Sequence, residues 1–151
     1  MPALTKSEIE RFLSTGTNIL KLATIAPDGY PYVVPLWFWY EDHKVMLAGR
    51  RQNEWLKHIE VNGKVGACID TPPPGPRVQI KGTASILDTS WTGDWEPHAI
   101  RYTGREAGHA YYEKTKAIPR VLVSIEPEHV ISWSGADWHS KYYEDFGKPG
   151  D

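Results

Sequence analysis

The feature that most constrains the fold is an uncharged, largely apolar run over residues 30–40, which contains Pro31 and Pro35. Side chains alternate between the two faces of a strand, so this run has two apolar faces, and we expect both to be covered. The barrel interior would cover one face, and a helix, a second subunit or a ligand the other. Because proline cannot donate to a strand ladder, Pro35 predicts an edge strand or a bulge whose free backbone groups face a ligand. A strand simply buried on both sides is the alternative.

The rest of the chain predicts short strands at close spacing, with a few helices between them. The expected strands are 18–25, 31–40, 45–48, 64–70, 77–87, 120–125 and 128–133. Helices are expected from the Thr5–Glu8 or Ser7–Glu10 capping box to Gly16, from Asn53 to about residue 60, over 97–102, and from the Thr103–Glu106 box to about residue 116. This pattern predicts a mainly β fold, a six- or seven-stranded antiparallel barrel with helices outside. We expect a single domain over residues 1–151, with an N-terminal helix within 1–15 and a polar, aromatic tail over 134–151.

Composition excludes several partners and compartments. A net charge of −2 gives no general attraction to nucleic acid or to an anionic membrane, so we predict neither partner. The apolar run over 30–40 is far shorter than the ~20 residues of a membrane helix. A single cysteine cannot form an internal disulfide, and the first residues have no apolar signal core. These features predict a cytoplasmic protein.

A basic loop, Arg50-Arg51-Gln52, precedes the helix that Asn53 is expected to cap. A helix N-terminus presents free N–H groups, and arginines add paired donors, so this loop predicts a phosphate site. A solvated basic turn is the alternative.

A second polar set, Arg77, Gln79 and Lys81, alternates with apolar residues along the strand over 77–87. It forms a donor-rich face that would lie under a ligand or across a dimer interface. A solvated outer face of the barrel is as compatible with the pattern.

Other kinds of site have no support in the sequence. The histidines at positions 43, 58, 98, 109, 129 and 139 form no pair with metal-ligand spacing, and Cys68 lies alone in an apolar strand, as a core residue would. No GxSxG, GxxxxGK[ST] or GxGxxG motif is present. We therefore predict no metal site and assign no catalytic residue.

Several segments, taken in order, resemble one family. Residues 20–24, Pro27-Asp28-Gly29 and residues 33–38 are similar to the opening hairpin of the FMN-binding split β-barrel proteins, the pyridoxamine 5′-phosphate oxidase-like flavin and deazaflavin oxidoreductases. The likeness continues through residues 51–59, 78–82, 101–104 and 131–133, and it covers roughly residues 5–135.

The resemblance implies a split β-barrel that forms a homodimer, with two cofactor sites at the subunit interface. The ring would lie along residues 34–37, the loop with Arg50 and Arg51 would hold the phosphate, and Trp133 and the tail would reach the other subunit's site. The cofactor-binding residues that it implies are Val34, Pro35, Leu36, Trp37, Arg50, Arg51, Gln52, Trp55, Gln79, Lys81 and Trp133. Many relatives carry lysine or arginine where this chain has Trp55, so phosphate binding would rest on the loop arginines and helix N–H groups. The full arginine and lysine pattern of a true pyridoxamine phosphate oxidase is absent, and that substrate is not assigned.

The function that the resemblance implies is hydride transfer between bound FMN, or the 8-hydroxy-5-deazaflavin coenzyme, and a small organic substrate. In such enzymes the cofactor performs the hard step, which explains why no acid–base constellation is visible. Trp37 and Trp39 are expected to shape the pocket over the ring. Two alternatives keep the same fold: a non-catalytic flavin-binding module, and a cofactor-free interaction module, for which Trp55 is the best hint.

Overall fold

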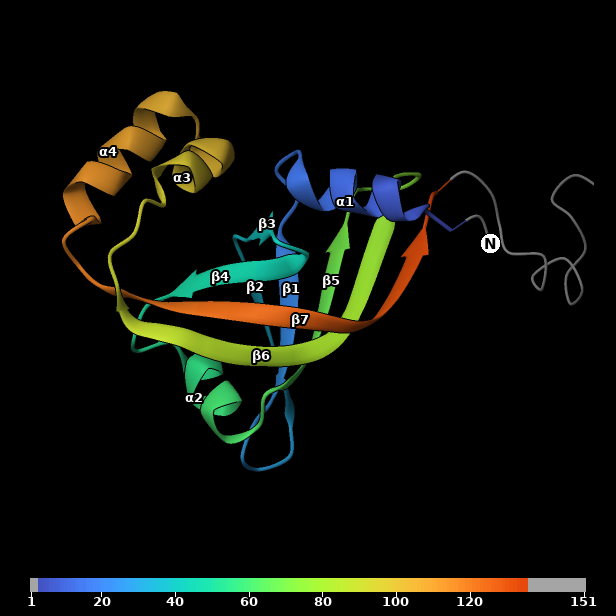
Figure 1. Cartoon of the computed structure of the whole chain (residues 1–151), viewed down its shortest axis with the longest axis horizontal. Helices are drawn as coiled ribbons and strands as arrows, with labels where there is room; N and C mark the ends of the chain where they lie inside the picture. Colours follow the sequence, from blue (N-terminus) through green and yellow to red (C-terminus); the bar gives the residue numbers. More distant parts are fainter. Residues whose placement is uncertain (1–2, 136–151) are drawn as a thin grey trace, which may run out of the picture.

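The computed structural model describes residues 3–135, which form one coiled sheet of seven strands with helices around it (Figure 1). The strands are β1 (Leu20–Ile25), β2 (Pro31–Leu36), β3 (Trp39–Glu41), β4 (Lys44–Gly49), β5 (Lys64–Asp70), β6 (Arg77–Trp91) and β7 (Arg120–Trp133). The helices are α1 (Lys6–Ser14), α2 (Glu54–Val61), α3 (Glu96–Thr103) and α4 (Arg105–Thr115). Of the expected tail over 134–151, all but Ser134 and Gly135 lies outside the described residues.

The strand order is β2-β1-β5-β6-β7-β4-β3, and every neighbouring pair is antiparallel. The two edge strands, β2 and β3, are consecutive in the chain and are separated only by Trp37 and Phe38. The sheet therefore coils until its two edges adjoin, which gives the split barrel that the sequence predicts. Pro35 lies on an edge strand, where its missing N–H costs no ladder bond.

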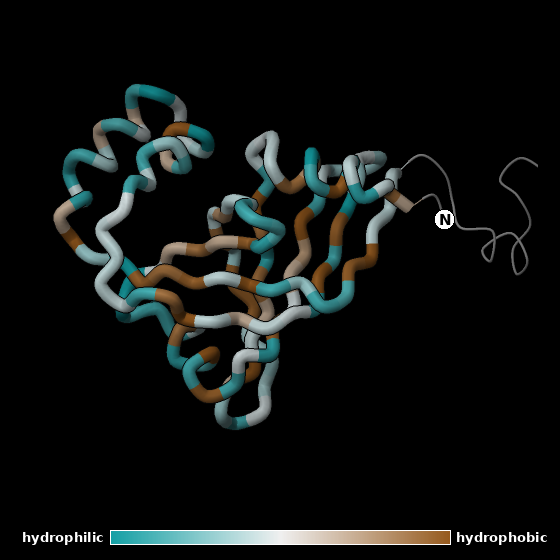
Figure 2. Tube along the Cα trace, in the orientation of Figure 1, coloured by the Kyte–Doolittle hydropathy of each residue, from teal (hydrophilic) through white to brown (hydrophobic). Residues whose placement is uncertain are grey.

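The barrel interior is the hydrophobic core. Alternate residues of β5 and β6 are buried, and fully buried side chains such as Leu22, Ile69 and Val78 converge from different strands. Figure 2 shows hydrophobic residues along the strands and hydrophilic ones over much of α3 and α4. Helices α1 and α2 lie at opposite ends of the barrel (Figure 1), and they bury Leu13 and Trp55 respectively.

The strand expected over 31–40 is interrupted at Trp37 and Phe38, because side chains of α3 form hydrogen bonds with the backbone there. The carbonyl oxygen of Phe38 accepts hydrogen bonds from Arg101 Nη1 at 3.0 Å and from the Tyr102 hydroxyl at 3.3 Å. A backbone carbonyl bonded to a helix in this way does not need a neighbouring strand. The run therefore divides into β2 and β3, and the Phe38 side chain turns into the core at 1% exposure.

The two strands expected over 120–125 and 128–133 are one strand, β7. Its register against β6 shifts where Lys81 pairs with His129 and Gly82 pairs with Pro127, so that Glu128 is the extra residue of a bulge. Proline at 127 therefore bends the strand without ending it.

Two of the expected helix caps differ in the structure. Thr5 and Glu8 form the predicted capping box of α1. The Thr103–Glu106 box is wrong: α4 begins after Gly104, and the Thr103 hydroxyl donates to the Ala99 carbonyl one turn earlier. Asn53 stands at the N-cap of α2, but its side chain accepts from the Arg50 N–H and so closes the loop instead.

Within residues 3–135, no helix combines the length and apolar character needed to cross a membrane.

Candidate functional site

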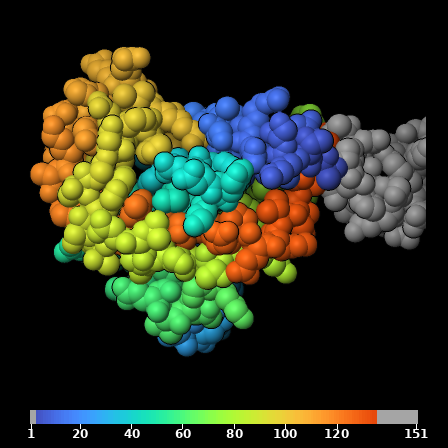
Figure 3. All heavy atoms as spheres, in the orientation of Figure 1, coloured from blue at the N-terminus to red at the C-terminus, as the bar shows by residue number. Residues whose placement is uncertain are grey.

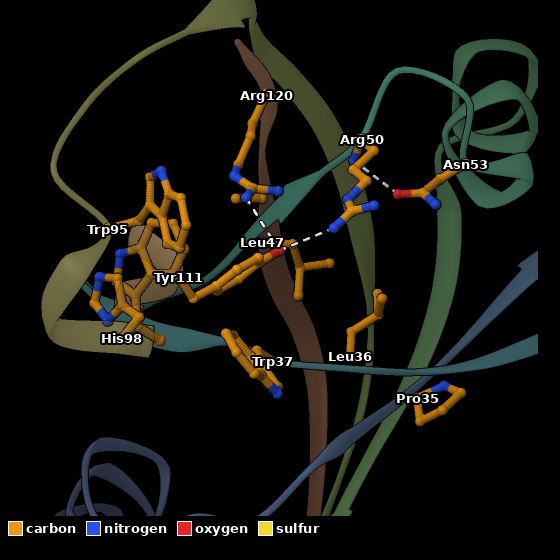
Figure 4. A pocket seen from close by; sticks show the side chains of 12 residues that line it. Pro35, Leu36, Trp37, Leu47, Arg50, Asn53, Trp95, His98, Tyr111 and Arg120 are labelled. Carbon is orange, nitrogen blue, oxygen red and sulfur yellow. Dashed lines mark hydrogen bonds between the residues drawn. The ribbon is translucent and has the colours of Figure 1, made fainter. Parts of the chain in front are cut away.

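A cavity of about 370 Å³ lies between the barrel and the pair of helices α3 and α4. These helices stand as a lobe beside the barrel (Figure 3). We call this space the aromatic cavity; it is lined by Pro35, Leu36, Trp37, Trp39, Leu47, Ala48, Arg50, Asn53, Trp95, His98, Tyr111 and Arg120. Its floor is made by β2 and β4, and its roof by α3, α4 and the start of β7 (Figure 4). Its volume lies in the range of small-molecule and cofactor sites.

A second cavity of about 360 Å³ adjoins the first. This arginine cavity is lined by Arg50, Arg51, Gln52, Thr115, Ile118, Pro119 and Arg120. Arg50 and Arg120 belong to both linings and so mark where the two cavities meet. Among residues 3–135, neither lining includes a carboxylate, so the joint site has a positive end and a flat aromatic end.

Stacked rings make the walls of the aromatic cavity rigid. The Trp37 ring stacks on Tyr102, with centroids 5.1 Å apart, and the Trp39 ring stacks on His98, with centroids 4.2 Å apart. Burial, reinforced by the charge of Arg101, lowers the pKa of His98 below its ordinary value. His98 is therefore neutral at neutral pH, and the wall that it forms carries no charge.

Arg120 is the most unusual group of the site. Its residue is 8% exposed, its guanidinium lies 4.1 Å from the centroid of the Trp95 ring, and its Nε is buried without a hydrogen-bond partner. None of the ion pairs found among residues 3–135 involves this side chain. A buried charge is costly unless an opposite charge or hydrogen bonds compensate it. The geometry therefore favours an anionic ligand at the junction of the two cavities.

Arg120 and Arg50 meet at the hydroxyl of Tyr111 (Figure 4). Arg50 Nη2 donates to the Tyr111 oxygen at 3.0 Å, and Arg120 Nη2 donates to the same oxygen at 3.2 Å. Arg120 Nη2 also donates to Thr115 Oγ1 at 3.3 Å. Partial burial acts to raise the pKa of Tyr111, but the two guanidinium groups outweigh it and bring the pKa below the ordinary value for tyrosine.

The structure brings together six of the residues implied at the sequence level. Pro35, Leu36, Trp37 and Arg50 line the aromatic cavity, and Arg51 and Gln52 join Arg50 in the arginine cavity. The guanidinium of Arg51 is already engaged, however: its Nε donates to the Thr89 carbonyl and its Nη2 to Ser90 Oγ. Arg51 thus ties its loop to the end of β6.

Five other implied residues line neither cavity. Trp55 is 1% exposed and packs in the core, and Val34 is half-buried against that core. Gln79 and Lys81 project from β6 into a shallow groove on the outer face of the sheet. Trp133 lies near the end of β7, where its ring sits 5.5 Å from the Arg77 guanidinium carbon.

Sequence reasoning missed the four residues that form the roof of the aromatic cavity, namely Trp95, His98, Tyr111 and Arg120. Trp95 and His98 lie next to or within the helix expected over 97–102, and Tyr111 lies in the helix expected to end near residue 116. The pattern of neither helix distinguishes an aromatic residue that lines a cavity from one that packs in a core. Arg120 did leave a signal: it is a charged residue that opens the largely apolar segment over 120–125, and it proves to be buried. A charge at such a position is rarely buried without a partner or a ligand.

Fold and cavities together define the chain as a split β-barrel of the flavin-binding type. It belongs to the pyridoxamine 5′-phosphate oxidase family, whose sequence model matches residues 5–134.

Solved structures of the same fold include a conserved hypothetical protein from Mycobacterium tuberculosis, with 22% identity, a TM-score of 0.68, and coverage of 88% of this chain and 86% of that one. An F420 reductase matches with 22% identity and a TM-score of 0.64, over 86% of this chain and 98% of that one. An FAD-binding protein from Mesorhizobium loti matches with 23% identity and a TM-score of 0.60, over 87% and 95%. No curated protein sequence matches the chain.

Proposed function

We propose that this chain is an oxidoreductase that transfers hydride between bound FMN, or alternatively the 8-hydroxy-5-deazaflavin coenzyme, and a small organic substrate. The observation that carries the proposal is the junction of a flat aromatic cavity with a cavity rich in arginine. The buried Arg120, which has an orphaned Nε and no carboxylate partner among residues 3–135, fits the phosphate of such a cofactor. When bound, the cofactor supplies the hydride chemistry.

The residues of the chain bind and orient that cofactor. Pro35, Leu36 and Trp37 would line one side of its ring, and Arg50 and Arg120 would hold its phosphate with charge-assisted hydrogen bonds. Gln52 adds an amide donor at the edge of the arginine cavity. The aromatic roof would exclude water from the ring.

Likeness in fold supports both of these cofactors. The similar structures include an FAD-binding protein and an F420 reductase, and coenzyme F420 is a deazaflavin. Its long acidic tail would suit a basic cavity that is open to solvent, and FMN would place a single phosphate there. We propose FMN first and the deazaflavin as the alternative.

We further propose that the chain acts as a cytoplasmic homodimer. The outer face of β1, β2, β5, β6 and β7 carries a groove of about 340 Å³ with large apolar residues around it. Val33 is 63% exposed and Ile131 is 49% exposed there, beside Gln79 and Lys81. A second copy would cover this face, and it would bring Gln79, Lys81 and Trp133 of one subunit toward the cofactor of the other. Cys68, a free cysteine, is compatible with a reducing compartment.

The test is the absorbance spectrum of the purified, undenatured protein, followed by titration with FMN, FAD and the deazaflavin coenzyme. Melting temperature is the readout, because a ligand that binds only the native state stabilises it by mass action. We expect a flavin spectrum, or a saturable rise with one cofactor, and reduction of that cofactor by a suitable donor. A coloured protein that no donor turns over would identify a flavin-binding module instead. A colourless protein indifferent to all three would identify an interaction module.

A further inference from the structure

The hydroxyl of Tyr111 accepts two hydrogen bonds from charged groups. Its partners, Arg50 and Arg120, are guanidinium groups, which donate and cannot accept. The Tyr111 oxygen is therefore the acceptor in both bonds, and its own O–H hydrogen is used in neither. Among residues 3–135, this hydroxyl donates no hydrogen bond. Since Tyr111 lines the aromatic cavity beside both arginines, its hydrogen is available to a ligand at that point.

The two arginines also keep donors for a ligand. Arg50 uses only Nη2 of its side chain, on Tyr111, and Arg120 uses Nη2 on Tyr111 and Thr115. The Nη1 group of each guanidinium has no hydrogen-bond partner in the described part of the chain. Arg50 follows β4, Arg120 opens β7 and Tyr111 lies on α4, so donors from three parts of the fold converge at the junction of the two cavities.

The charge and the donors at this junction indicate the chemistry of the ligand. Neither cavity lining includes a carboxylate among residues 3–135. Arg51, the third arginine of the arginine cavity, is bonded to a carbonyl and a hydroxyl, so its charge is not compensated either. A terminal phosphate group carries about −2 charge and three strong acceptor oxygens. A phosphodiester has one charge and one free oxygen fewer, and it would leave a converging donor unmatched.

We propose that Tyr111 is a phosphate-binding residue, which donates its O–H to a terminal phosphate that Arg50 and Arg120 also bind, and that the three side chains select a phosphomonoester over a phosphodiester. The rest of the ligand comes from the proposed function, on which this inference rests, because FMN ends in a phosphomonoester.

The two guanidinium groups strengthen Tyr111 as a donor. Partial burial acts to raise the pKa of Tyr111, but the hydrogen bonds and charges of Arg50 and Arg120 outweigh it and lower that pKa. A more acidic O–H donates a stronger hydrogen bond, and an anion is the acceptor that gains most from it. Trp95 supports the group, since its ring lies 4.1 Å from the Arg120 guanidinium and packs edge-on against Tyr111.

The experiment compares the wild-type protein with Tyr111→Phe and with the control Tyr112→Phe. Tyr112 is the next residue of α4, its ring packs edge-on against Trp95, and it lines neither cavity. Each protein is titrated at about pH 8, where a phosphomonoester is a dianion. The probes are methyl phosphate, dimethyl phosphate, FMN and riboflavin, which is FMN without its phosphate. The rise of the melting temperature with ligand concentration gives each affinity.

We expect Tyr111→Phe to bind methyl phosphate and FMN about tenfold or more weakly, the usual effect of losing a hydrogen bond to a charged group. Its affinity for riboflavin should equal that of the wild type, because riboflavin has nothing to place at the junction. The wild type should prefer methyl phosphate to dimethyl phosphate, and this preference should shrink in Tyr111→Phe. Tyr112→Phe should match the wild type with every probe.

A second readout follows the phenol itself. Tyrosinate absorbance, taken as the difference between wild type and Tyr111→Phe, should show one phenol that ionises below its ordinary pKa of 10.0. Saturating methyl phosphate should move this ionisation to higher pH, because the dianion accepts the phenol's hydrogen and offsets the arginine charges. By linkage, the wild-type affinity for methyl phosphate should fall as pH rises through the pKa of Tyr111.

Several outcomes would overturn the inference: equal affinity of wild type and Tyr111→Phe for methyl phosphate, an equal loss of riboflavin affinity, no preference for the monoester, or a tyrosinate titration indifferent to methyl phosphate. A wild-type protein that binds FMN no better than riboflavin would overturn it as well, and would leave the proposed function standing. A wild-type protein that binds methyl phosphate through Tyr111, but neither a flavin nor the deazaflavin coenzyme, would refute the proposed function and support the phosphate site.

Discussion

At the scale of single residues, three arginines that lie within a short reach of one another have different tasks. Arg51 is bonded to the backbone and side chain at the end of β6, so its charge supports a loop. Arg50 and Arg120 face the cavities and share only the neutral oxygen of Tyr111. Sequence spacing alone favours Arg50 and Arg51 as a pair, because Arg120 reaches the site only through the fold.

We predict that Arg120→Ala lowers the affinity for FMN by at least tenfold, since it removes a charged hydrogen-bond donor worth about 1.5–3 kcal/mol. The stability of the cofactor-free protein should change much less, because the wild-type charge is buried without an anionic partner. Isothermal titration with FMN and urea unfolding measure the two effects. Arg105→Ala, at an exposed position of α4, is the control. Equal FMN affinity in both variants would remove Arg120 from the site.

His98 gives a prediction in pH. Its folded-state pKa lies below the ordinary value of 6.5, mainly because it is buried, with Arg101 adding to the effect and Glu41 and Asp94 opposing it. The unfolded chain therefore takes up a proton first as pH falls, and folding stability should be lost progressively below about pH 6.5. In His98→Phe, which keeps a ring to stack on Trp39, the decline between pH 7 and pH 5 should be shallower. Urea midpoints at each pH measure this, and parallel curves would contradict it.

At the scale of elements, the sequence predicted most helices and strands. It did not predict that the strand expected over 31–40 divides into β2 and β3. Periodicity and turn residues locate β1, β5 and α2 because those signals are local. The interruption at Trp37 and Phe38 depends on Arg101, which is 63 residues further along the chain than Phe38. Bonds over such a separation leave no periodic pattern in either segment.

Arg101 is therefore expected to stabilise the way α3 docks on the barrel. Its Nε and Nη2 donate to the carbonyls of Gly16 and Thr15, and its Nη1 donates to that of Phe38. Arg101→Ala should lower the free energy of unfolding by about 1–3 kcal/mol, since it removes the donor to the Thr15 and Gly16 carbonyls and one of the two donors to the Phe38 carbonyl. Urea unfolding and the near-ultraviolet circular dichroism of the aromatic cluster would report the loss. A variant as stable as Arg105→Ala would show that this contact does not hold the helix.

The bulge between β6 and β7 requires glycine at position 82. A Cβ there would lie 2.3 Å from the carbonyl oxygen of Glu126, which is backbone and cannot rotate away. Gly82→Ala should therefore cost about 1–3 kcal/mol, as overpacking commonly does. Gly66→Ala is the matched control on β5, because a Cβ there meets only contacts of 3.8 Å and longer. Equal urea midpoints for the two variants would contradict this account.

At the scale of the whole molecule, the outer face of the sheet predicts the oligomeric state. Val33→Asp would place a charge on the proposed interface, so we expect it to convert the dimer into a folded monomer. Val61→Asp is the control, because Val61 is 77% exposed at the end of α2. Light scattering coupled to size-exclusion chromatography gives the mass. A wild-type protein that is already a monomer would contradict the homodimer.

The two halves of the site differ in how far the sequence could predict them. The floor comes from one hairpin and the loop after it, with Pro35, Leu36, Trp37 and Arg50 close together in the chain. The roof comes from residues 95–120, whose helices have no strong amphipathic pattern and whose aromatic residues pack mainly on one another. Only tertiary structure brings Arg120 next to Arg50.

Helices α3 and α4 are an insertion between β6 and β7, two strands that already pair along most of their length. A hairpin of that kind can close with a tight turn, so the barrel does not need the inserted segment in order to form its core. Mutation can accordingly lengthen, shorten or replace the segment while β6 stays paired with β7, although the backbone at Phe38 would lose its bonds to Arg101 and Tyr102. The fold thus separates the strands that form the core from the segment over 92–119, and under the proposed function new substrate ranges would arise in that segment first.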